Sequence, residues 1–189
     1  MFVFVGLGNI GSRYQNTPHN AGFLFADMLR EYLGYDTLFS VDEWSIDKLV
    51  ESQVCFARSK GEKRAIIAKP TTLMNASGRA VRNILKNYNA TVTDLVVIHD
   101  DLDLKLGEFK IQKGVGPKGH NGIISIVNGV GTTDFLRVRL GIETRQTPEE
   151  RSRLAGEDFV LKPYSESELV TLSETIADAV KSLRSIIQI

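Results

Sequence analysis

The sequence predicts a single α/β domain in which helices cover a sheet and an amphipathic helix follows near the carboxyl end. Short apolar runs rich in β-branched and aromatic residues alternate with segments whose apolar residues recur at helical spacing. The 189 residues are 42% hydrophobic and 24% charged, which is typical of a globular protein with one core. No repeat, low-complexity tract or linker divides the chain, so we expect one domain over residues 1–189.

Each element follows from a local pattern. Strands are expected at Phe2–Val5, Gln53–Arg58, Arg64–Ala68, Leu95–His99, Glu108–Gln112 and Phe135–Ile142. Helices are expected at Phe23–Leu33, which Gly34 should end, at Leu73–Tyr88, and along an apolar stripe from Leu169 to Leu183 after a Ser165/Glu168 capping box. Two stretches, Lys113–Gly119 and Glu143–Glu157, are expected to be irregular because they are rich in glycine or in charge.

Charge and cysteine content restrict the classes of function. The 23 basic residues balance the 23 acidic ones, so any nucleic-acid contact needs a local basic patch. The single cysteine, Cys55, excludes a disulfide framework and a thiolate zinc site, and suits a reducing cytoplasm. The start of the chain does not resemble a signal or transit peptide, and no apolar run approaches the ~20 residues that span a bilayer. We therefore expect a cytoplasmic protein without a membrane segment.

The opening stretch MFVFVGLGNIG spells the G-x-G-x-x-G of a dinucleotide-binding turn. Such a turn needs a helix that starts at its last glycines, but Asn16 and Pro18 delay a helix until about Asn20. A second strand with an acidic end is also missing where the Phe23–Leu33 helix is expected. The stretch is better interpreted as a strand followed by a polar loop that carries Asn9, Tyr14 and His19.

Each of the three histidines precedes an amide or a carboxylate. His19-Asn20 and His120-Asn121 open expected helices, so each asparagine could cap a helix or contact a substrate. His99-Asp100 ends the apolar run LVVI, where the Asp100 carboxylate could accept a hydrogen bond from one histidine nitrogen and leave the other as a base.

The cluster His99, Asp100, Asp101 and Asp103 has a competing interpretation as a magnesium or manganese site. These residues lie almost next to one another at the end of a strand and lack the spacing of metal ligands on a helix, which counts against this interpretation. The evidence for covalent catalysis is weaker than that for a metal site, because there is no G-x-S-x-G elbow and Cys55 lies in an apolar stretch.

Amide and basic groups complete the candidate site. Asn75 opens a helix after the strand RAIIAK, where it could donate to a developing oxyanion or only solvate the helix end. Lys110 and Lys113 lie on one expected strand and its glycine loop, and Arg137 and Arg139 share a face of another by period two. Together they could form a phosphate track, although a solvated strand face explains each group separately.

Five blocks in order, GLGNIGSRYQNTPHNAG, KPTTLMNASG, VVIHDDLDL, GHNGI and FLRVRLGI, resemble those of bacterial-type peptidyl-tRNA hydrolases. The resemblance runs from about Val3 to Ser165. It implies a monomer with a twisted mixed sheet flanked by helices, and no metal, cofactor, membrane or obligate protein partner. It also implies hydrolysis of the ester between peptide and transfer RNA, which recycles tRNA from aborted translation.

The resemblance also assigns roles by position. It implies that His19 is the general base, that Asp100 holds its tautomer, and that Asn9 contacts the peptide and helps to reject a free α-amino group. The remaining substrate or tRNA contacts that it implies are Tyr14, Leu73, Met74, Asn75, His120, Asn121, Lys110, Lys113, Arg137 and Arg139.

The chain departs from the family pattern in its basic residues. Gln112 stands where relatives carry a basic residue that clamps the tRNA 5′ phosphate, so Lys110 or Lys113 would replace it, with Arg137 or Arg139 as a partner. Pro117 and Lys118 stiffen and charge the loop before GHNG, and Pro18 replaces a residue that is commonly basic.

Two rival functions remain on the sequence alone. A non-catalytic RNA-binding relative, such as the plant organellar splicing factors of this fold, would not need His19, Asp100, Asn9 and Asn75 together. A metal-dependent phosphoesterase that used the His99–Asp103 cluster would lose activity in EDTA.

Overall fold

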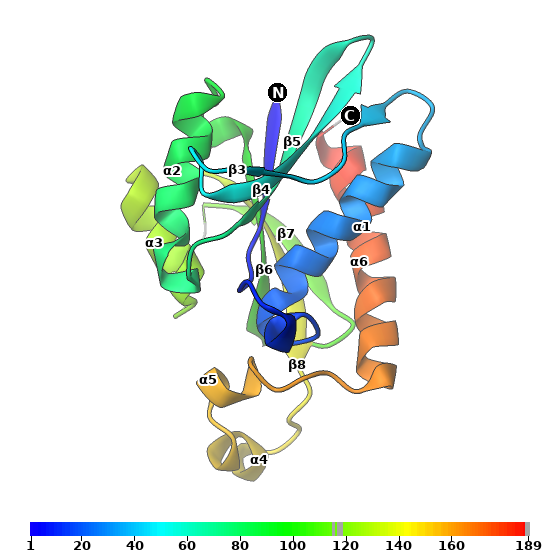
Figure 1. Cartoon of the computed structure of the whole chain (residues 1–189). Helices are drawn as coiled ribbons and strands as arrows, with labels where there is room; N and C mark the ends of the chain where they lie inside the picture. Colours follow the sequence, from blue (N-terminus) through cyan, green and yellow to red (C-terminus); the bar gives the residue numbers. More distant parts are fainter. Residues whose placement is uncertain (115, 117–118, 188–189) are drawn as a thin grey trace.

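A mixed sheet forms the middle layer of the computed structural model, which describes residues 1–114, 116 and 119–187 (Figure 1). Its strands run in the order β2, β4, β5, β1, β6, β8, β7, and β3 pairs with β4. They comprise β1 (Phe2–Gly6), β2 (Ser40–Val41), β3 (Ser45–Asp47), β4 (Ser52–Ser59), β5 (Glu62–Pro70), β6 (Leu95–Lys105), β7 (Phe109–Lys113) and β8 (Leu136–Glu143). The central strands β5, β1, β6 and β8 are parallel, and the outer pairings are antiparallel.

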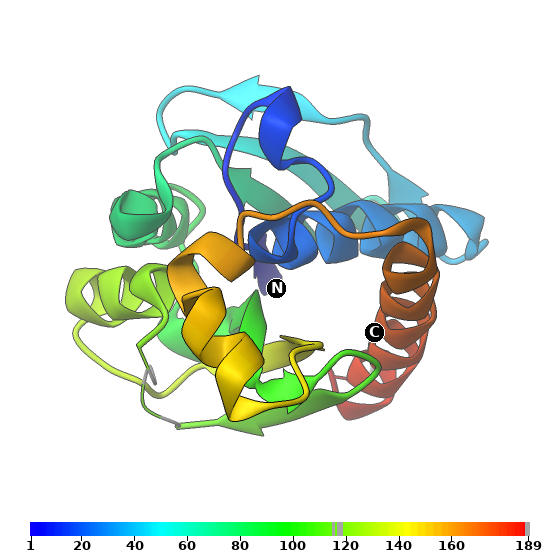
Figure 2. The ribbon, with the colours of Figure 1, turned by 90° about the horizontal axis from the view of Figure 1, so that it is seen from below.

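Helices cover both faces of the sheet. α1 and α6 lie on one face and α2 and α3 on the other, while α4 and α5 lie beyond the carboxyl ends of the central strands (Figures 1 and 2). The α-helices are α1 (Ala21–Tyr35), α2 (Ser77–Asn87), α3 (Asn121–Val130), α4 (Pro148–Arg153), α5 (Gly156–Phe159) and α6 (Glu166–Ile187). The 3-10 turns are η1 (Ser12–Tyr14), η2 (Pro18–Asn20), η3 (Met74–Ala76) and η4 (Val92–Asp94). No helix in the described part of the chain is long and apolar enough to cross a membrane.

The apolar patterns of the sequence explain these layers. Phe25, Leu29 and Leu33 repeat every four residues on α1 and are buried against the sheet. On the opposite face, Ile84 of α2 and Ile123 of α3 are fully buried. Because both faces are covered, the central strands are continuous apolar runs such as FVFV and LVVI, as in other buried parallel sheets.

The predicted fold class is confirmed, with a mixed sheet, flanking helices and a helix near the carboxyl end. The Ser165/Glu168 capping box is present in full, with bonds between each side chain and the other residue's backbone amide. Several boundaries differ from expectation, and the expected helix 73–88 is divided into the turn η3 and a shorter α2 that ends at Asn87. α1 continues through Gly34 to Tyr35, and β6 extends past His99 to Lys105, because β8 pairs with it as far as Lys105.

The stretch 143–157 was expected to be irregular, and this prediction is wrong. It contains α4, which Thr147 and Glu150 begin with a second capping box, and the start of α5. The short strands β2 and β3 carry too few residues to show a period in the sequence. Pro117 and Lys118, which were expected to stiffen and charge the glycine loop, lie outside the described residues.

Candidate active site

The candidate site begins where β1 and β6 end side by side. Gly6 of β1 is in register with Ile98 of β6, so the loop after β1 and the residues after Ile98 meet at one edge. The carboxyl ends of parallel strands are where open α/β sheets usually form sites. Asp100 lies on β6 just past this edge and is only 3% exposed. A buried carboxylate of this kind needs donors, because leaving it unpaired costs about 3–5 kcal/mol.

His19 supplies the first donor to Asp100. It lies on η2, which continues directly into α1, and its backbone amide donates to the Val160 carbonyl at 2.9 Å. Its Nδ1 lies 3.1 Å from both oxygens of Asp100. A charged carboxylate only accepts hydrogen bonds, so Nδ1 carries the proton and Nε2 keeps a lone pair.

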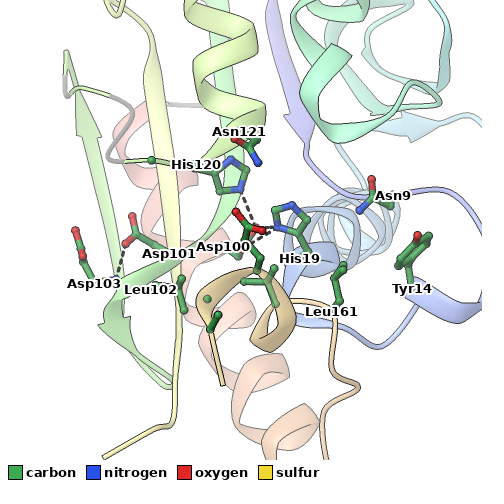
Figure 3. Close-up of a pocket in the computed structure, with 15 residues that line it drawn as sticks. Asn9, Tyr14, His19, Asp100, Asp101, Leu102, Asp103, His120, Asn121 and Leu161 are labelled. Atoms are coloured by element: carbon green, nitrogen blue, oxygen red, sulfur yellow. Dashed lines mark hydrogen bonds and ion pairs between the residues drawn. The ribbon is translucent and has the colours of Figure 1, made fainter. Parts of the chain in front are cut away.

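His120 supplies the second donor to the same carboxylate. Its Nε2 lies 2.9 Å from Oδ1 of Asp100, and its ring centroid lies 5.2 Å from that of His19 (Figure 3). Its Nδ1 accepts from the backbone amides of Gly122 and Ile123 in the first turn of α3, at 3.1 and 3.3 Å. His120 is therefore the N-cap of α3, so of the two roles that the sequence left open for Asn121 the capping role belongs to its neighbour.

The electrostatics follow from this shared contact. Burial alone would raise the pKa of the Asp100 carboxyl, but His120 and His19 outweigh burial and hold that pKa below its ordinary value. Burial lowers the pKa of His19, and Asp100 outweighs it, so the pKa of His19 is raised above 6.5. The site thus contains a buried carboxylate that stays charged and an imidazole whose pKa this carboxylate raises.

Asn9 is fixed by Asn20, a role that the sequence did not show. The Asn20 side chain accepts from the Asn9 amide at 2.8 Å and donates to the Asn9 carbonyl at 3.0 Å. Asn20 stands at the N-cap position of α1 but makes no capping bond, so it clamps the loop instead of the helix. The Asn9 side chain remains at the wall of the cavity (Figure 3).

The glycines of GLGNIG bring α1 close to the end of β1. A Cβ on Gly6 would lie 2.1 Å from the Gly22 carbonyl oxygen, and a Cβ on Gly22 would lie 2.4 Å from the Leu7 nitrogen. The absence of a side chain at Gly6 and Gly22 thus lets the helix that follows His19 pack closely against the end of β1. No dinucleotide turn forms, because the loop passes through two 3-10 turns before α1 begins.

The cavity beside this cluster has a volume of about 720 Å³. Residues of four separate segments line it, namely Asn9, Tyr14, His19, Asp100, Asp101, Leu102, Asp103, Gly119, His120, Asn121, Ala155, Gly156, Glu157, Val160 and Leu161. The contribution of α5 and the following turn was missed from the sequence, since nothing in the charged stretch around them indicated a site.

Several expected contacts lie away from this cavity. Leu73 is 69% exposed and Asn75 is also exposed, whereas Met74 is buried beneath the start of α3, close to Gly122. None of the three lines the cavity. Their expected contact with substrate near the ester stays a prediction.

The two arginines of β8 do not form the expected exposed track. Arg137 and Arg139 are 1% and 4% exposed, and Arg139 Nε donates to Asp101 at 2.5 Å. Their strand lies inside the sheet, between β6 and β7, so neither offers a surface to an RNA phosphate. The expected track therefore reduces to Lys110 and Lys113, which are exposed on the edge strand β7.

The His99–Asp103 run is not gathered into a metal site. His99 is 2% exposed and its Nδ1 donates to the Asp100 carbonyl at 2.7 Å, while Asp101 is paired with Arg139. Burial, and then the nearby His120, lower the pKa of His99 well below its ordinary value.

A different trio, His19, Asp100 and His120, has ligand atoms within 4.8 Å of one another. For a neutral His120 to bind a metal through Nε2, its proton would have to move to Nδ1, where two amide hydrogens already point. The trio is therefore poorly suited to a metal ion.

Comparison with known proteins decides the family. A family model described as peptidyl-tRNA hydrolase matches residues 3–189. The chain belongs to the peptidyl-tRNA hydrolase family. It is 40% identical to the peptidyl-tRNA hydrolase of Nocardia farcinica over 96% of this chain and 89% of that one, and 36% identical to that of Mycoplasma mycoides over 96% and 90%.

The crystal structure of peptidyl-tRNA hydrolase from Acinetobacter baumannii has the same fold. It superposes with a TM-score of 0.82 at 29% identity, covering 100% of this chain and 89% of that one. The match spans the sheet and all its flanking helices, so the cluster described above belongs to a peptidyl-tRNA hydrolase fold. The family resemblance that the sequence indicated is confirmed.

Proposed function

We propose that this peptidyl-tRNA hydrolase uses His19 as a general base, oriented by Asp100, to activate the water that cleaves the ester between peptide and tRNA. The observation that carries the proposal is the pairing of His19 Nδ1 with both oxygens of a buried carboxylate. That pairing fixes the tautomer that leaves Nε2 as a proton acceptor. Members of the family are named for hydrolysis of this substrate.

The reaction needs one proton acceptor and donors for the developing oxyanion. His19 Nε2 takes a proton from water as the water oxygen attacks the ester carbonyl carbon. The tetrahedral intermediate expels the ribose oxygen, which takes the proton back from the imidazolium. The side-chain amides of Asn9 and Asn121 line the same cavity and can donate to the substrate.

Asn9 is also the residue that we propose to contact the peptide and to disfavour a free α-amino group. Support comes from its placement. Both backbone groups of Asn9 are held by Asn20, so its side chain projects from a fixed point close to His19 (Figure 3).

The tRNA is proposed to lie along the edge of the sheet formed by β7. Lys110 and Lys113 are exposed there, and the chain leads from β7 towards His120 at the start of α3. Lys113 Nζ pairs with Asp134 at 3.1 Å, so a phosphate would have to compete with that carboxylate. We further propose that the enzyme acts in the cytoplasm as a monomer, without a cofactor or an obligate protein partner.

Release of tRNA from an N-acetyl-aminoacyl-tRNA, compared with the unblocked aminoacyl-tRNA, tests the proposal. The blocked substrate should be cleaved and the unblocked one spared. His19→Ala should lower kcat by about 10²- to 10⁴-fold and leave the dissociation constant for the blocked substrate within a few-fold. Added imidazole should restore part of the lost rate.

Three results would contradict the proposal or favour a rival. No release from either substrate would indicate an RNA-binding protein without catalysis. Loss of activity in EDTA would favour a metal-dependent reaction. An equal loss of binding and turnover in His19→Ala would assign His19 to substrate binding, not to proton transfer.

A further inference from the structure

The Asp100 carboxylate is divided between two histidines whose tautomers are fixed in opposite ways. His19 donates through Nδ1 and keeps Nε2 as the acceptor. His120 donates through Nε2, because its Nδ1 is occupied by the amides of Gly122 and Ile123. The start of α3 therefore fixes Nδ1 of His120 as the acceptor and leaves Nε2 as the nitrogen that faces Asp100.

We propose that His120 is a positioning residue, a donor held in place by the start of α3, that occupies one oxygen of Asp100 and thereby sets how strongly this carboxylate holds His19. The inference rests on the proposed role of His19 as the base. A hydrogen bond to a charged carboxylate stabilises its charge, so each donor reduces the attraction that remains for the other. His120 would therefore keep His19 from becoming too strongly protonated to act near neutral pH.

Other charged or titratable groups also face this cluster. The charged or titratable side chains that line the cavity together with His19 are Asp100, His120, Tyr14, Glu157, Asp101 and Asp103. Asp101 is paired with Arg139, whose Nη2 also lies 3.8 Å from Asp103, and Glu157 is exposed on α5. His99 is buried edge-on to His120, with ring centroids 4.9 Å apart, and Tyr164 is buried within the electrostatic range of Asp100. Among the described residues, His120 is the one that shares a side-chain hydrogen bond to Asp100 with His19.

A variant pair separates this role from substrate contact and from helix capping. His120→Asn keeps a residue favoured at an N-cap, but its side chain is too short to reach Asp100. His120→Gln places an amide donor at nearly the original reach. Gly131→Ala destabilises α3 at its far end, where Gly131 has a φ of 79°, and leaves Asp100 untouched.

The wild-type rate should rise with pH through an apparent pKa above 6.5, because the base must be neutral. In His120→Asn the carboxylate no longer shares an oxygen with a second histidine and should raise the pKa of His19 further, so that kcat/KM at pH 6 falls roughly 3- to 10-fold and recovers at higher pH. The pH profile of His120→Gln should lie closer to that of the wild type, and Gly131→Ala should lower Tm without moving the pH profile.

Titration of the His19 ring signal by NMR in the free protein measures the pKa of His19 without substrate. A raised pKa of His19 in His120→Asn supports the inference even if the hydrolysis assay fails, so the two proposals can fail separately. An unchanged or lowered pKa of His19 would overturn it. A raised KM with an unmoved profile would instead make His120 a substrate contact, and a lowered Tm with an unmoved profile would make it a helix cap alone.

Discussion

The two His-Asn pairs of this chain, in HNAG and HNGI, stand at helix starts and perform opposite tasks. In the first pair, His19 donates to Asp100 from Nδ1, and Asn20 turns back to clamp the loop at Asn9. In the second pair, His120 caps its own helix through Nδ1 and donates to Asp100 from Nε2, while Asn121 is exposed at the cavity wall.

The difference lies in what precedes each helix. A 3-10 turn carries His19 into α1, so its side chain is not aligned with the helix amides. His120 is the N-cap residue itself, with φ of −72° and ψ of 114°, which places its ring over the first amides of α3. The same two residue types therefore give a base on one side of Asp100 and a fixed donor on the other.

The largest expected effect comes from the carboxylate that both pairs share. Asp100→Asn offers one acceptor oxygen in place of two and adds a donor that faces the histidines. We expect kcat to fall by about 10²- to 10⁴-fold. The pKa of His19 should fall as well, since burial lowers it and Asp100 no longer raises it.

The pH profile of kcat/KM and the NMR titration of His19 measure both consequences. If Asp100→Asn left the profile of the wild type in place, the shared contact would have no part in setting the base. His19→Ala is the matched reference, because it removes the base and keeps the carboxylate.

Substitution of Asn20 or Asn121 should have a smaller effect, and the two substitutions should differ in whether they change stability or substrate binding. Asn20→Ala removes both bonds to the Asn9 backbone, and we expect a loss of about 1–3 kcal/mol in the free energy of unfolding together with a roughly 10-fold loss in kcat/KM. Asn121→Ala should stay within about 0.5 kcal/mol of the wild type in stability, because Asn121 is exposed, while KM rises.

Denaturant unfolding and steady-state kinetics on the two variants check this contrast. Equal destabilisation by both substitutions would refute the assignment of Asn20 as a clamp. A loss of stability in Asn20→Ala with unchanged kinetics would show that the position of Asn9 has no bearing on the reaction.

The smallest effect is expected from the exposed lysines on the edge strand β7. Lys110→Ala should weaken tRNA binding a few-fold at moderate salt and reduce the slope of log K against log[salt] by about 0.7–0.9, since one phosphate contact is lost. The value of kcat at saturating substrate should not change.

Lys60→Ala, in the turn between β4 and β5 at one end of the sheet, serves as the charge-matched control. An equal change in the salt slope for both variants would mean that net charge, and not the β7 edge, governs the approach of RNA.

Local patterns in the sequence predicted the elements that have a clear period. FVFV and LVVI identified the central strands, and the Ser165/Glu168 box identified the start of α6. Short pieces such as β2 and α5 were missed because a few residues show no period and owe their conformation to their neighbours.

The sequence likewise indicated some residues of the candidate site and could not place others. The sequence indicated His19 and Asp100 because a polar loop and a carboxylate each follow an apolar strand, and these residues do meet. It could not show that Arg137 and Arg139 are buried, since strand alternation does not reveal whether both faces of a strand are covered.

By itself, the sequence determined the central strands and the long helices, the family, and the side chains available for chemistry, because these follow from patterns read along the chain. Only the tertiary structure decided how those side chains are used. It brings His19 and His120, 101 positions apart, to one carboxylate, and the amides of α3 set the tautomer of one while leaving the other free. Hydrogen-bond direction depends on which groups meet in space, and no local pattern specifies that.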